Sequence, residues 1–262
     1  MDVVELVAAA AVDVTKFVTA SEASYQAFKT ASLLKTLSVN ALIMGEVGVG
    51  KKSLASFILP DASIVDASNF DELLVTLESC NEIIISNIDT SPNLERLVQT
   101  IQNNSIRVIA TSKQSFSNKF TDDLFSIKLD IPPLAIRVED VDLLVDVFAK
   151  EAALLFGGEQ ELDLDNFTPN LTLNAKSLKR QVMIKYLLQD IKDNELMEII
   201  QNYLHNKMGS NSDYRNFLYL YEVPLIKAGL SRFKSQLQLS DKLGLNRNTL
   251  RKKIADNKEH LN

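Results

Sequence analysis

The sequence predicts an α/β fold, in which a parallel sheet with a phosphate-binding loop is followed by a helical subdomain and a small all-α domain. Three observations support this prediction. Short β-branched runs alternate with helical patterns over the first half of the chain, a glycine-rich loop follows the first run, and strand patterns end after Pro132-Pro133. Alternating strands and helices favour a parallel sheet that helices cover on both faces.

The elements follow in order from the spacing of apolar residues. A helical pattern covers residues 21–37. Four apolar runs predict strands at residues 41–44, 63–65, 83–85 and 106–110. Helices are expected between them at residues 71–77 and 94–101, and after the two prolines at residues 138–155, 175–188 and 195–205. The polar, breaker-rich segment 208–213 is typical of a linker.

Composition excludes several classes of protein. Hydrophobic residues make up 46% and charged residues 24% of the 262 residues, as in ordinary globular proteins. No apolar run is long enough for a membrane span, and the run at residues 6–12 lacks the basic flank of a secretory signal. A single cysteine, Cys80, fits a reducing cytoplasm. With only two histidines, we expect no zinc site and no other metal.

A glycine-rich heptapeptide, Gly45-Glu-Val-Gly-Val-Gly-Lys51, follows the first predicted strand and opens a helix. Glycines let backbone N–H groups turn inward around phosphate oxygens, and a lysine at this place reaches the terminal phosphates. We therefore expect a phosphate-binding loop on which ATP or ADP is the candidate ligand. The candidate contacts are Gly45, Gly48, Gly50, Lys51, Lys52 and Ser53.

The surroundings of this loop depart from what hydrolysis requires. Lys52 stands where many such loops have Ser or Thr for magnesium, and Ser53 comes one position too late. The additional cation favours phosphate or replaces the metal, and the sequence leaves both open. Hydrolysis also needs acidic residues at the tip of a neighbouring strand, where this chain has Ser86 and Asn87. Asp89 lies further on, and we expect it to cap the turn before the next helix.

The last forty residues predict two helices joined by a tight turn. Gly244 suits the turn because glycine adopts positive φ without penalty, and Asn246 is a good N-cap for the second helix. Leu250 and Ile254 lie four residues apart and can pack inward. The opposite face carries Arg247, Asn248, Arg251 and Lys252. Such side chains can donate hydrogen bonds to base edges and contact phosphates.

Charge is segregated along the chain. Residues 225–262 contain nine Lys or Arg and three Asp or Glu, whereas the whole chain has a net charge of −6. An acidic body with a basic C-terminal module indicates that only this end meets a polyanion.

The body of the chain resembles the AAA+ domain of NtrC-type, sigma-54-dependent transcription activators (bacterial enhancer-binding proteins). The resemblance covers residues 21–149. It is carried by the glycine-rich heptapeptide, Arg107-Val-Ile-Ala-Thr111, Lys119-Phe-Thr-Asp-Asp-Leu-Phe125, Ile131-Pro-Pro-Leu134 and Arg137-Val-Glu-Asp140. It implies a P-loop AAA+ parallel sheet at residues 1–137 and a helical lid at residues 138–207.

The tail resembles the DNA-binding domain of the Fis family, through Gly244-Leu-Asn-Arg-Asn-Thr-Leu-Arg-Lys-Lys253. This resemblance implies a helix-turn-helix domain at residues 214–262 that binds double-stranded DNA as a dimer or higher oligomer. The implied DNA-facing residues are Asn246, Arg247, Asn248, Thr249, Arg251, Lys252 and Lys253. The hydrophobic face of a helix over residues 214–228 is the expected pairing surface.

The departures from the NtrC-type pattern concern its motor. The acidic pair of the family would fall at Ser86 and Asn87, and Thr121 stands at the place of an arginine finger. The second arginine would fall in a shortened stretch before Pro132, and the sensor arginine of the lid near Leu178. The GAFTGA loop that touches sigma-54 has no counterpart in residues 53–82, so we expect no contact with sigma-54. We also expect no receiver domain before the core.

Losing these groups predicts a pseudo-ATPase, since an arginine finger alone contributes roughly 10³–10⁵-fold to phosphoryl transfer. The leading hypothesis is a DNA-binding transcription regulator of the Fis type on a degenerate AAA+ scaffold. Two alternatives stay open at this point. One is an active ATPase that remodels a transcription partner, and the other is a switch that senses nucleotide without hydrolysing it.

Overall fold

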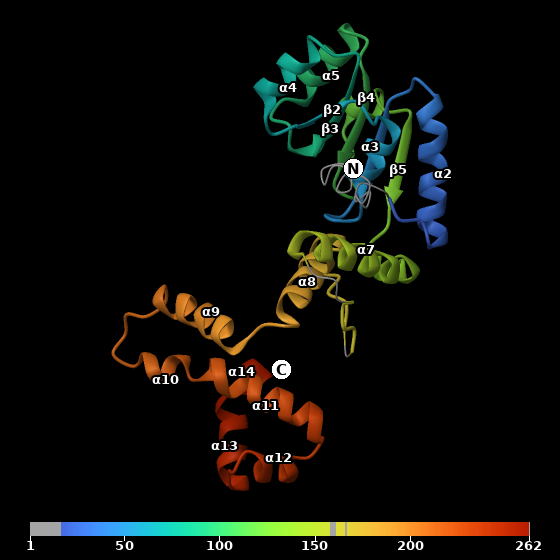
Figure 1. Cartoon of the computed structure of the whole chain (residues 1–262). Helices are drawn as coiled ribbons and strands as arrows, with labels where there is room; N and C mark the ends of the chain where they lie inside the picture. Colours follow the sequence, from blue (N-terminus) through green and yellow to red (C-terminus); the bar gives the residue numbers. More distant parts are fainter. Residues whose placement is uncertain (1–16, 158–160, 166, 262) are drawn as a thin grey trace, which may run out of the picture. The chain divides into compact units, whose positions relative to one another are not determined.

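The computed structural model describes residues 17–157, 161–165 and 167–261 (Figure 1). The chain divides into two compact units, Met1–Asp190 and Ile191–Asn262. The apolar run at residues 6–12 and the start of the predicted core lie outside the described residues. None of the described helices is long and apolar enough to cross a membrane.

The first unit is built on a parallel sheet in the order β2-β3-β4-β1-β5. The strands are β1 (Ala41–Gly45), β2 (Ser63–Asp66), β3 (Glu82–Ser86), β4 (Arg107–Ser112) and β5 (Ile127–Ile131). Four of them confirm the sequence prediction, and β5 was missed. Its side chains alternate in burial, with Ile131 buried and Lys128 and Asp130 exposed. An alternating edge strand gives a weaker pattern than a continuous apolar run.

Helices cover both faces of the sheet, as predicted. Figure 1 shows α2 beside β5 and α4 and α5 near the β2–β3 edge. Consecutive residues of β3 separate the two cores, because Ile83 and Ile85 pack with α4 and α5 while Ile84 packs with α2 and α3. The helices are α2 (Glu22–Thr36), α3 (Lys51–Ile58), α4 (Phe70–Leu77), α5 (Leu94–Asn103) and α6 (Lys119–Asp122).

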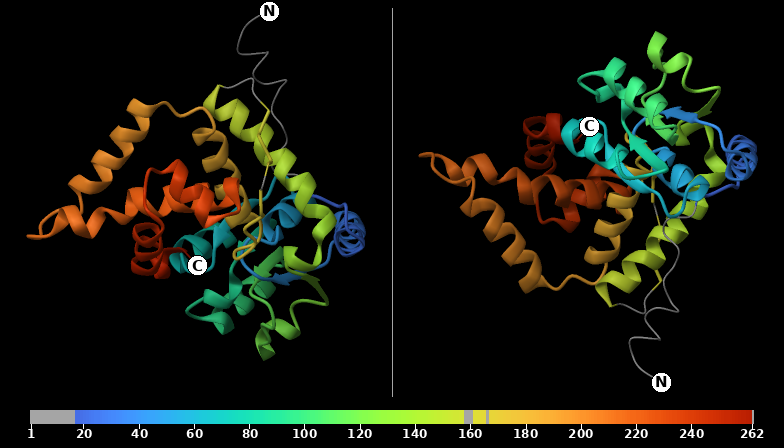
Figure 2. Two further views of the ribbon diagram at one scale, coloured as in Figure 1. Left: turned by 90° about the horizontal axis from the view of Figure 1, so that it is seen from below. Right: turned by 90° about the horizontal axis from the view of Figure 1, so that it is seen from above.

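A helical pair completes the first unit. Helices α7 (Val138–Phe156) and α8 (Ala175–Leu188) pack against each other, as both views of Figure 2 show. Their shared core contains Val141, Val145, Phe148, Leu178 and Val182. Gly157 ends α7 with a φ of +69°, which is the left-handed conformation that commonly terminates helices.

The second unit is entirely helical in its described part. It contains α9 (Asp193–His205), α10 (Asp213–Phe217), α11 (Tyr219–Phe233), α12 (Gln236–Lys242), α13 (Arg247–Asp256) and α14 (Lys258–Leu261). The predicted lid ended at residue 207, whereas α9 belongs to this second unit. The reason is that the apolar side of α9 lines a groove together with α10 and α11. The predicted helix at residues 214–228 is interrupted at Leu218.

Candidate nucleotide loop and candidate nucleic-acid interface

The glycine-rich loop between β1 and α3 needs its glycines for two reasons. Gly48 and Gly50 have φ angles of +82° and +103°, where side chains with a Cβ are strained. A Cβ on Gly48 would also lie 2.2 Å from the carbonyl oxygen of Leu173. The loop therefore has both the conformation and the close neighbours that exclude larger residues.

The backbone of this loop is polarised in the manner of an anion site. The carbonyl oxygens of Val47, Gly48 and Val49 accept hydrogen bonds from Asn174 Nδ2, Ala175 N and Arg137 Nη2, each at 3.0 Å. Within the described part of the chain, the N–H groups of Val47, Gly48 and Gly50 have no acceptor among the turn, loop and cap hydrogen bonds. Unpaired N–H groups in succession, followed by a helix N-terminus, form a concavity that attracts phosphate.

The ammonium group of Lys51 is hydrogen-bonded to the backbone of the same loop. Its Nζ lies 2.5 Å from the oxygen of Gly45 and 2.7 Å from that of Glu46. Burial lowers the pKa of Lys51, while the nearby carboxylates of Asp89 and Glu46 act in the opposite direction. A bound phosphate would offer the ammonium group charged acceptors in place of two neutral carbonyls.

A buried ion pair supports the outer side of the loop. Arg137 and Asp140 are 2% and 0% exposed, and their side chains meet at 3.2 Å. Asp140 also accepts from the N–H groups of Ala20 and Ser21, both at 2.8 Å. Arg137 reaches Val49 O, so α7, the start of α2 and the loop are joined by one network. The sequence contained the signal in Arg137-Val-Glu-Asp140, but its role as a support for the loop was not predicted.

Beside this network lies a small cavity. Its volume is about 90 Å³, and Gly50, Ser53, Leu144 and Val147 contribute to its walls. Phe17 also lines it and is stacked near the Arg137 guanidinium, 5.9 Å from its ring centre. The cavity places an apolar lining next to the unpaired N–H groups of the loop.

The tips of β2 and β3 carry the residues that replace the expected acidic pair. Asn87 Nδ2 donates to Asp66 Oδ2 at 2.7 Å, and Ser86 Oγ lies 3.4 Å from the same oxygen. Burial raises the pKa of Asp66, but hydrogen bonds from Ser68 and Asn87 and the charge of Lys52 outweigh it, so the pKa is lowered. In the described residues, no three His, Cys, Asp or Glu side chains converge on a metal position.

Asp89 does not cap the turn before the next helix, contrary to our expectation. Asn93 caps α5 by accepting from Arg96 N. Asp89 instead lies in the short 3-10 helix η1 (Ile88–Thr90) and accepts from Lys113 N at 3.2 Å. Its carboxylate therefore links this turn to the residue after β4.

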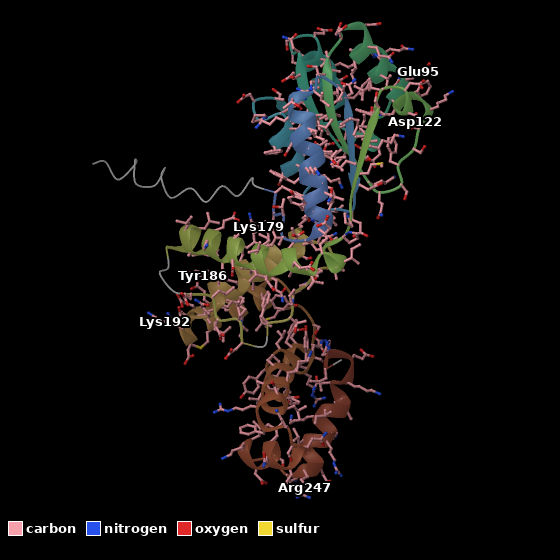
Figure 3. The ribbon with its side chains drawn as sticks, turned by 90° about the vertical axis from the view of Figure 1, so that its right-hand side faces the viewer. Glu95, Asp122, Lys179, Tyr186, Lys192 and Arg247 are labelled. Carbon is pink, nitrogen blue, oxygen red and sulfur yellow. The ribbon has the colours of Figure 1, made fainter. Side chains whose placement is uncertain are left out.

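Two expectations about arginine positions can be compared with the packing. Thr121 is fully buried and donates to Asn118 O at 2.9 Å. Its side chain is therefore not available to contact a ligand. Leu178, where the sensor arginine would fall, is buried in the α7–α8 core. Lys179, labelled in Figure 3, pairs with Glu151 at 2.5 Å. Asn174 and Ala175, at the start of α8, are the residues of this region that donate to the carbonyls of the loop in the described part of the chain.

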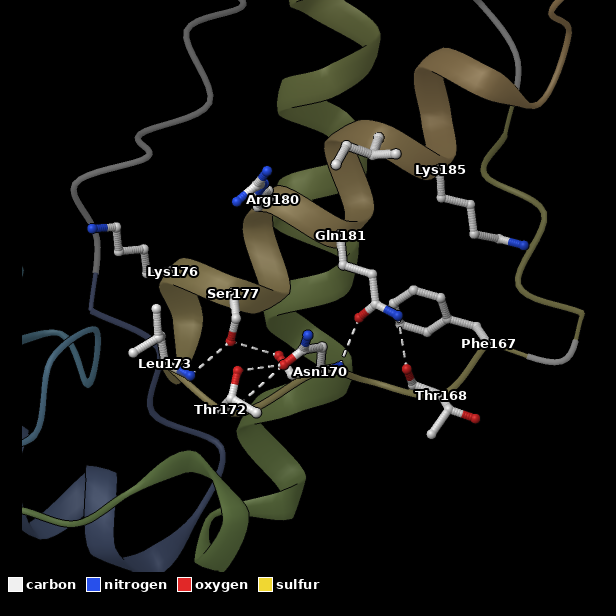
Figure 4. Close-up of a pocket in the computed structure, with 11 residues that line it drawn as sticks. Phe167, Thr168, Asn170, Thr172, Leu173, Lys176, Ser177, Arg180, Gln181 and Lys185 are labelled. Carbon is white, nitrogen blue, oxygen red and sulfur yellow. Dashed lines mark hydrogen bonds between the residues drawn. The ribbon is translucent and has the colours of Figure 1, made fainter. Parts of the chain in front are cut away.

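Asn174 is held in place by a segment folded onto α8. Figure 4 shows Ser177 and Gln181 of α8 hydrogen-bonded to this segment. Gln181 Oε1 accepts from Asn170 N at 2.7 Å, and Ser177 Oγ donates to Asn170 O at 2.7 Å. Asn174 Oδ1 in turn accepts from Leu134 N at 2.7 Å. The start of α8 is therefore fixed against the loop at several points.

In the second unit, α12 and α13 are joined by the predicted turn. Gly244 has a φ of +64°, and Asn246 Oδ1 accepts from Thr249 N at 2.8 Å, which confirms both sequence predictions. Leu250 is buried and packs with Ile226 and Leu239, with Ile254 partly buried beside them. This small core fixes the direction of α13.

The candidate DNA-facing residues fall into two groups. Arg247, Asn248, Arg251 and Lys252 are exposed, and none has a side-chain hydrogen bond or ion pair to another described residue. Figure 3 shows Arg247 at the start of α13. Asn246 and Thr249 use their polar atoms in the cap, and Lys253 is ion-paired with Glu222 of α11.

Sequence reasoning missed one neighbour of the exposed arginines. Gln236, at the start of α12, lines a cleft of about 120 Å³ together with Leu237, Arg247 and Arg251. The amide of Gln236 thus adds a donor and an acceptor beside two guanidinium groups. No periodicity in the sequence brings residues 236 and 247 together, since the turn between the helices does so.

Comparisons with known proteins bear on the fold. No family model matches the sequence, and no curated protein resembles it. Among solved structures, NtrX from Brucella abortus in complex with ADP is similar over 97% of this chain and 71% of its own, with a TM-score of 0.63 and 17% identity. A second NtrX structure covers 92% and 69%, with a TM-score of 0.58 and 15% identity.

The NtrX structure in complex with ATP covers 91% of this chain and 68% of that one, with a TM-score of 0.56 and 17% identity. At this identity, the likeness carries the fold and no activity. Combined with the strand order and the loop between β1 and α3, it shows that the chain has an α/β fold like that of these structures, with a five-stranded parallel sheet.

Proposed function

We propose that this protein is a sequence-specific, DNA-binding transcription regulator of the Fis type, carried on an AAA+ scaffold that does not hydrolyse ATP. The observation that carries the proposal is the outer face of α13. Its three cations and Asn248 have no side-chain hydrogen bond or ion pair to any residue that the structure describes, while a packed core and a capped turn fix their direction. A helix of this kind suits the major groove, where Arg and Asn recognise guanine and adenine edges.

The same proposal includes binding of ADP or ATP at the glycine-rich loop. Support comes from the N–H groups of Val47, Gly48 and Gly50, for which the described residues show no turn, loop or cap acceptor, from Lys51, and from the adjoining cavity. The structurally similar NtrX has been crystallised with ADP and with ATP. Hydrolysis is not expected, because Ser86 and Asn87 provide no acidic group and Thr121 is buried.

Self-association is the third part of the proposal. A groove of about 680 Å³ on the second unit is lined mainly by apolar side chains of α9, α10 and α11. Several of them are strongly exposed, including Tyr214 at 82% and Tyr221 at 68%. Apolar patches of this kind mark protein interfaces, and a second copy would also supply the two-fold symmetry that DNA half-sites reward.

Selection from a random duplex library tests the DNA-binding proposal. The full chain should enrich a two-fold symmetric sequence, and Arg247→Glu should lose the enrichment because it places a negative charge against the duplex. Recovery of no sequence above the input library would contradict the proposal.

Light scattering tests self-association. Ile200→Lys, in the groove, should shift the full chain from dimer to monomer, whereas Asn202→Lys on the exposed side of α9 should not. A wild-type chain that is monomeric both free and on DNA would refute the dimer.

The active ATPase remains the alternative function, and steady-state turnover distinguishes it. Phosphate release above background that disappears in Lys51→Ala would favour a working motor. We expect no such release. A thermal shift with ATP or ADP that Lys51→Ala abolishes would instead support nucleotide sensing without hydrolysis.

A further inference from the structure

The chemistry around the glycine-rich loop does not fit the magnesium ion that P-loop folds ordinarily hold. In such loops the residue after the lysine supplies a hydroxyl to Mg²⁺. Here that residue is Lys52, in the first turn of α3. An ammonium group has three donors and no acceptor, whereas Mg²⁺ demands oxygen ligands. A cation at this position repels a divalent ion where a ligand would be needed.

The opposite wall of the site offers no substitute ligand. Ser86 and Asn87 stand at the tip of β3, and both side chains are turned toward Asp66 on the neighbouring strand. Asp66 pairs in register with Ser86 at the end of β2, and its other oxygen accepts from Ser68 N and Oγ. Asp66 is thus already surrounded by donors, and Asp89, just beyond β3, is likewise held by Lys113 N at 3.2 Å and by the Lys113 ammonium group at 3.7 Å.

The positive charge of Lys52 acts on the carboxylate of Asp66. The charge of Lys52 is among the influences that lower the pKa of Asp66. The sequence thus places an exposed ammonium group in the first turn of α3, at the position that supplies the hydroxyl ligand of the metal in other such loops.

We propose that Lys52 takes the place of the magnesium ion, so that this protein binds adenine nucleotide without any divalent cation. The inference rests on the proposed nucleotide binding and specifies its chemistry. Lys51 and Lys52 together would neutralise the phosphates that one lysine and one metal ion neutralise elsewhere. Added magnesium then competes with Lys52 instead of assisting it.

Calorimetric titration of the full chain with ADP, once in EDTA and once in magnesium, tests this proposal. We expect wild-type affinity to be no weaker in EDTA than in magnesium. Lys52→Gln removes the charge at similar length and should weaken binding in EDTA by about 10- to 100-fold, the loss typical of one charge-assisted hydrogen bond. Lys52→Arg keeps the charge and should retain most of the affinity.

Each result has a separate meaning. Binding that requires magnesium would overturn the role of Lys52 while leaving nucleotide binding in place. Equal affinity of wild type and Lys52→Gln in EDTA would also overturn it. Absence of binding in both buffers would remove the proposed nucleotide binding itself, and this inference with it. Circular dichroism of the three proteins confirms that each variant is folded.

Discussion

The glycine-rich loop and the turn before α13 both lead a glycine turn into a helix with positive charge at its start, yet they are built in opposite ways. Around the loop, every outward carbonyl from Val47 to Val49 and the ammonium group of Lys51 are already hydrogen-bonded within the protein. On α13, Arg247 and Arg251 have no partner among the described residues.

The difference shows what each region requires of a ligand. At the loop, a phosphate must draw Lys51 away from Gly45 O and Glu46 O, so the gain in affinity is reduced by the bonds that are exchanged. On α13, a duplex meets side chains that give up only water and counterions. Substitutions at the loop should therefore disturb the first unit, whereas substitutions on α13 should change binding with little effect on folding.

The largest expected effect is at the buried ion pair that supports the loop. Asp140→Ala leaves Arg137 charged, fully buried and short of its acceptor, which typically costs about 3–5 kcal/mol. Urea unfolding of the first unit measures the loss. Asp142→Ala, an exposed site on the same helix, is the matched control and should be close to neutral. An equally small loss at both sites would show that the network does not support the loop.

Two glycines, one in the glycine-rich loop and one in the turn before α13, allow the stability of the two regions to be compared directly. Gly48→Ala combines positive φ with an overlap against Leu173 O, so we expect a loss of about 2–4 kcal/mol. Gly244→Ala has positive φ but open space around the new Cβ. We therefore expect its free energy of unfolding to fall by only about 1–2 kcal/mol. Thermal unfolding of the two variants should show this order, and the reverse order would mean that the contact with Leu173 is dispensable.

The smallest effect concerns pH. The pKa of Asp66 is lowered in the folded protein, so its charged form stabilises the fold above the unfolded pKa, near 3.9, and that contribution is lost as pH falls through the folded value. Asp66→Asn should cost under about 1 kcal/mol near neutral pH, because the group is close to solvent. The gap between the two proteins should narrow below about pH 4, and a gap independent of pH would contradict the assignment.

The features that could be predicted from the sequence are those set by residues close together in the chain. The four apolar strands, the loop glycines and the Asn246 cap all rest on neighbouring residues, and the structure agrees. The contact of Asn174 with the loop and the pairing of Lys253 with Glu222 join residues far apart in the chain. Local spacing contains no information on such contacts. For the same reason, α9 was assigned to the lid, since its groove forms only when α10 and α11 fold back.

The central claim is that α13 reads DNA with a defined set of cations, and the salt dependence of duplex affinity tests it most directly. Each phosphate contact contributes a slope of about −0.9 in a plot of log K against log salt concentration. Arg247→Ala or Arg251→Ala should weaken binding of the full chain and, where the lost contact is to a phosphate, flatten this slope by about one unit. Lys253→Ala, whose ammonium group is held by Glu222, should change it little. Unchanged affinity and slope in the two arginine variants would contradict the account.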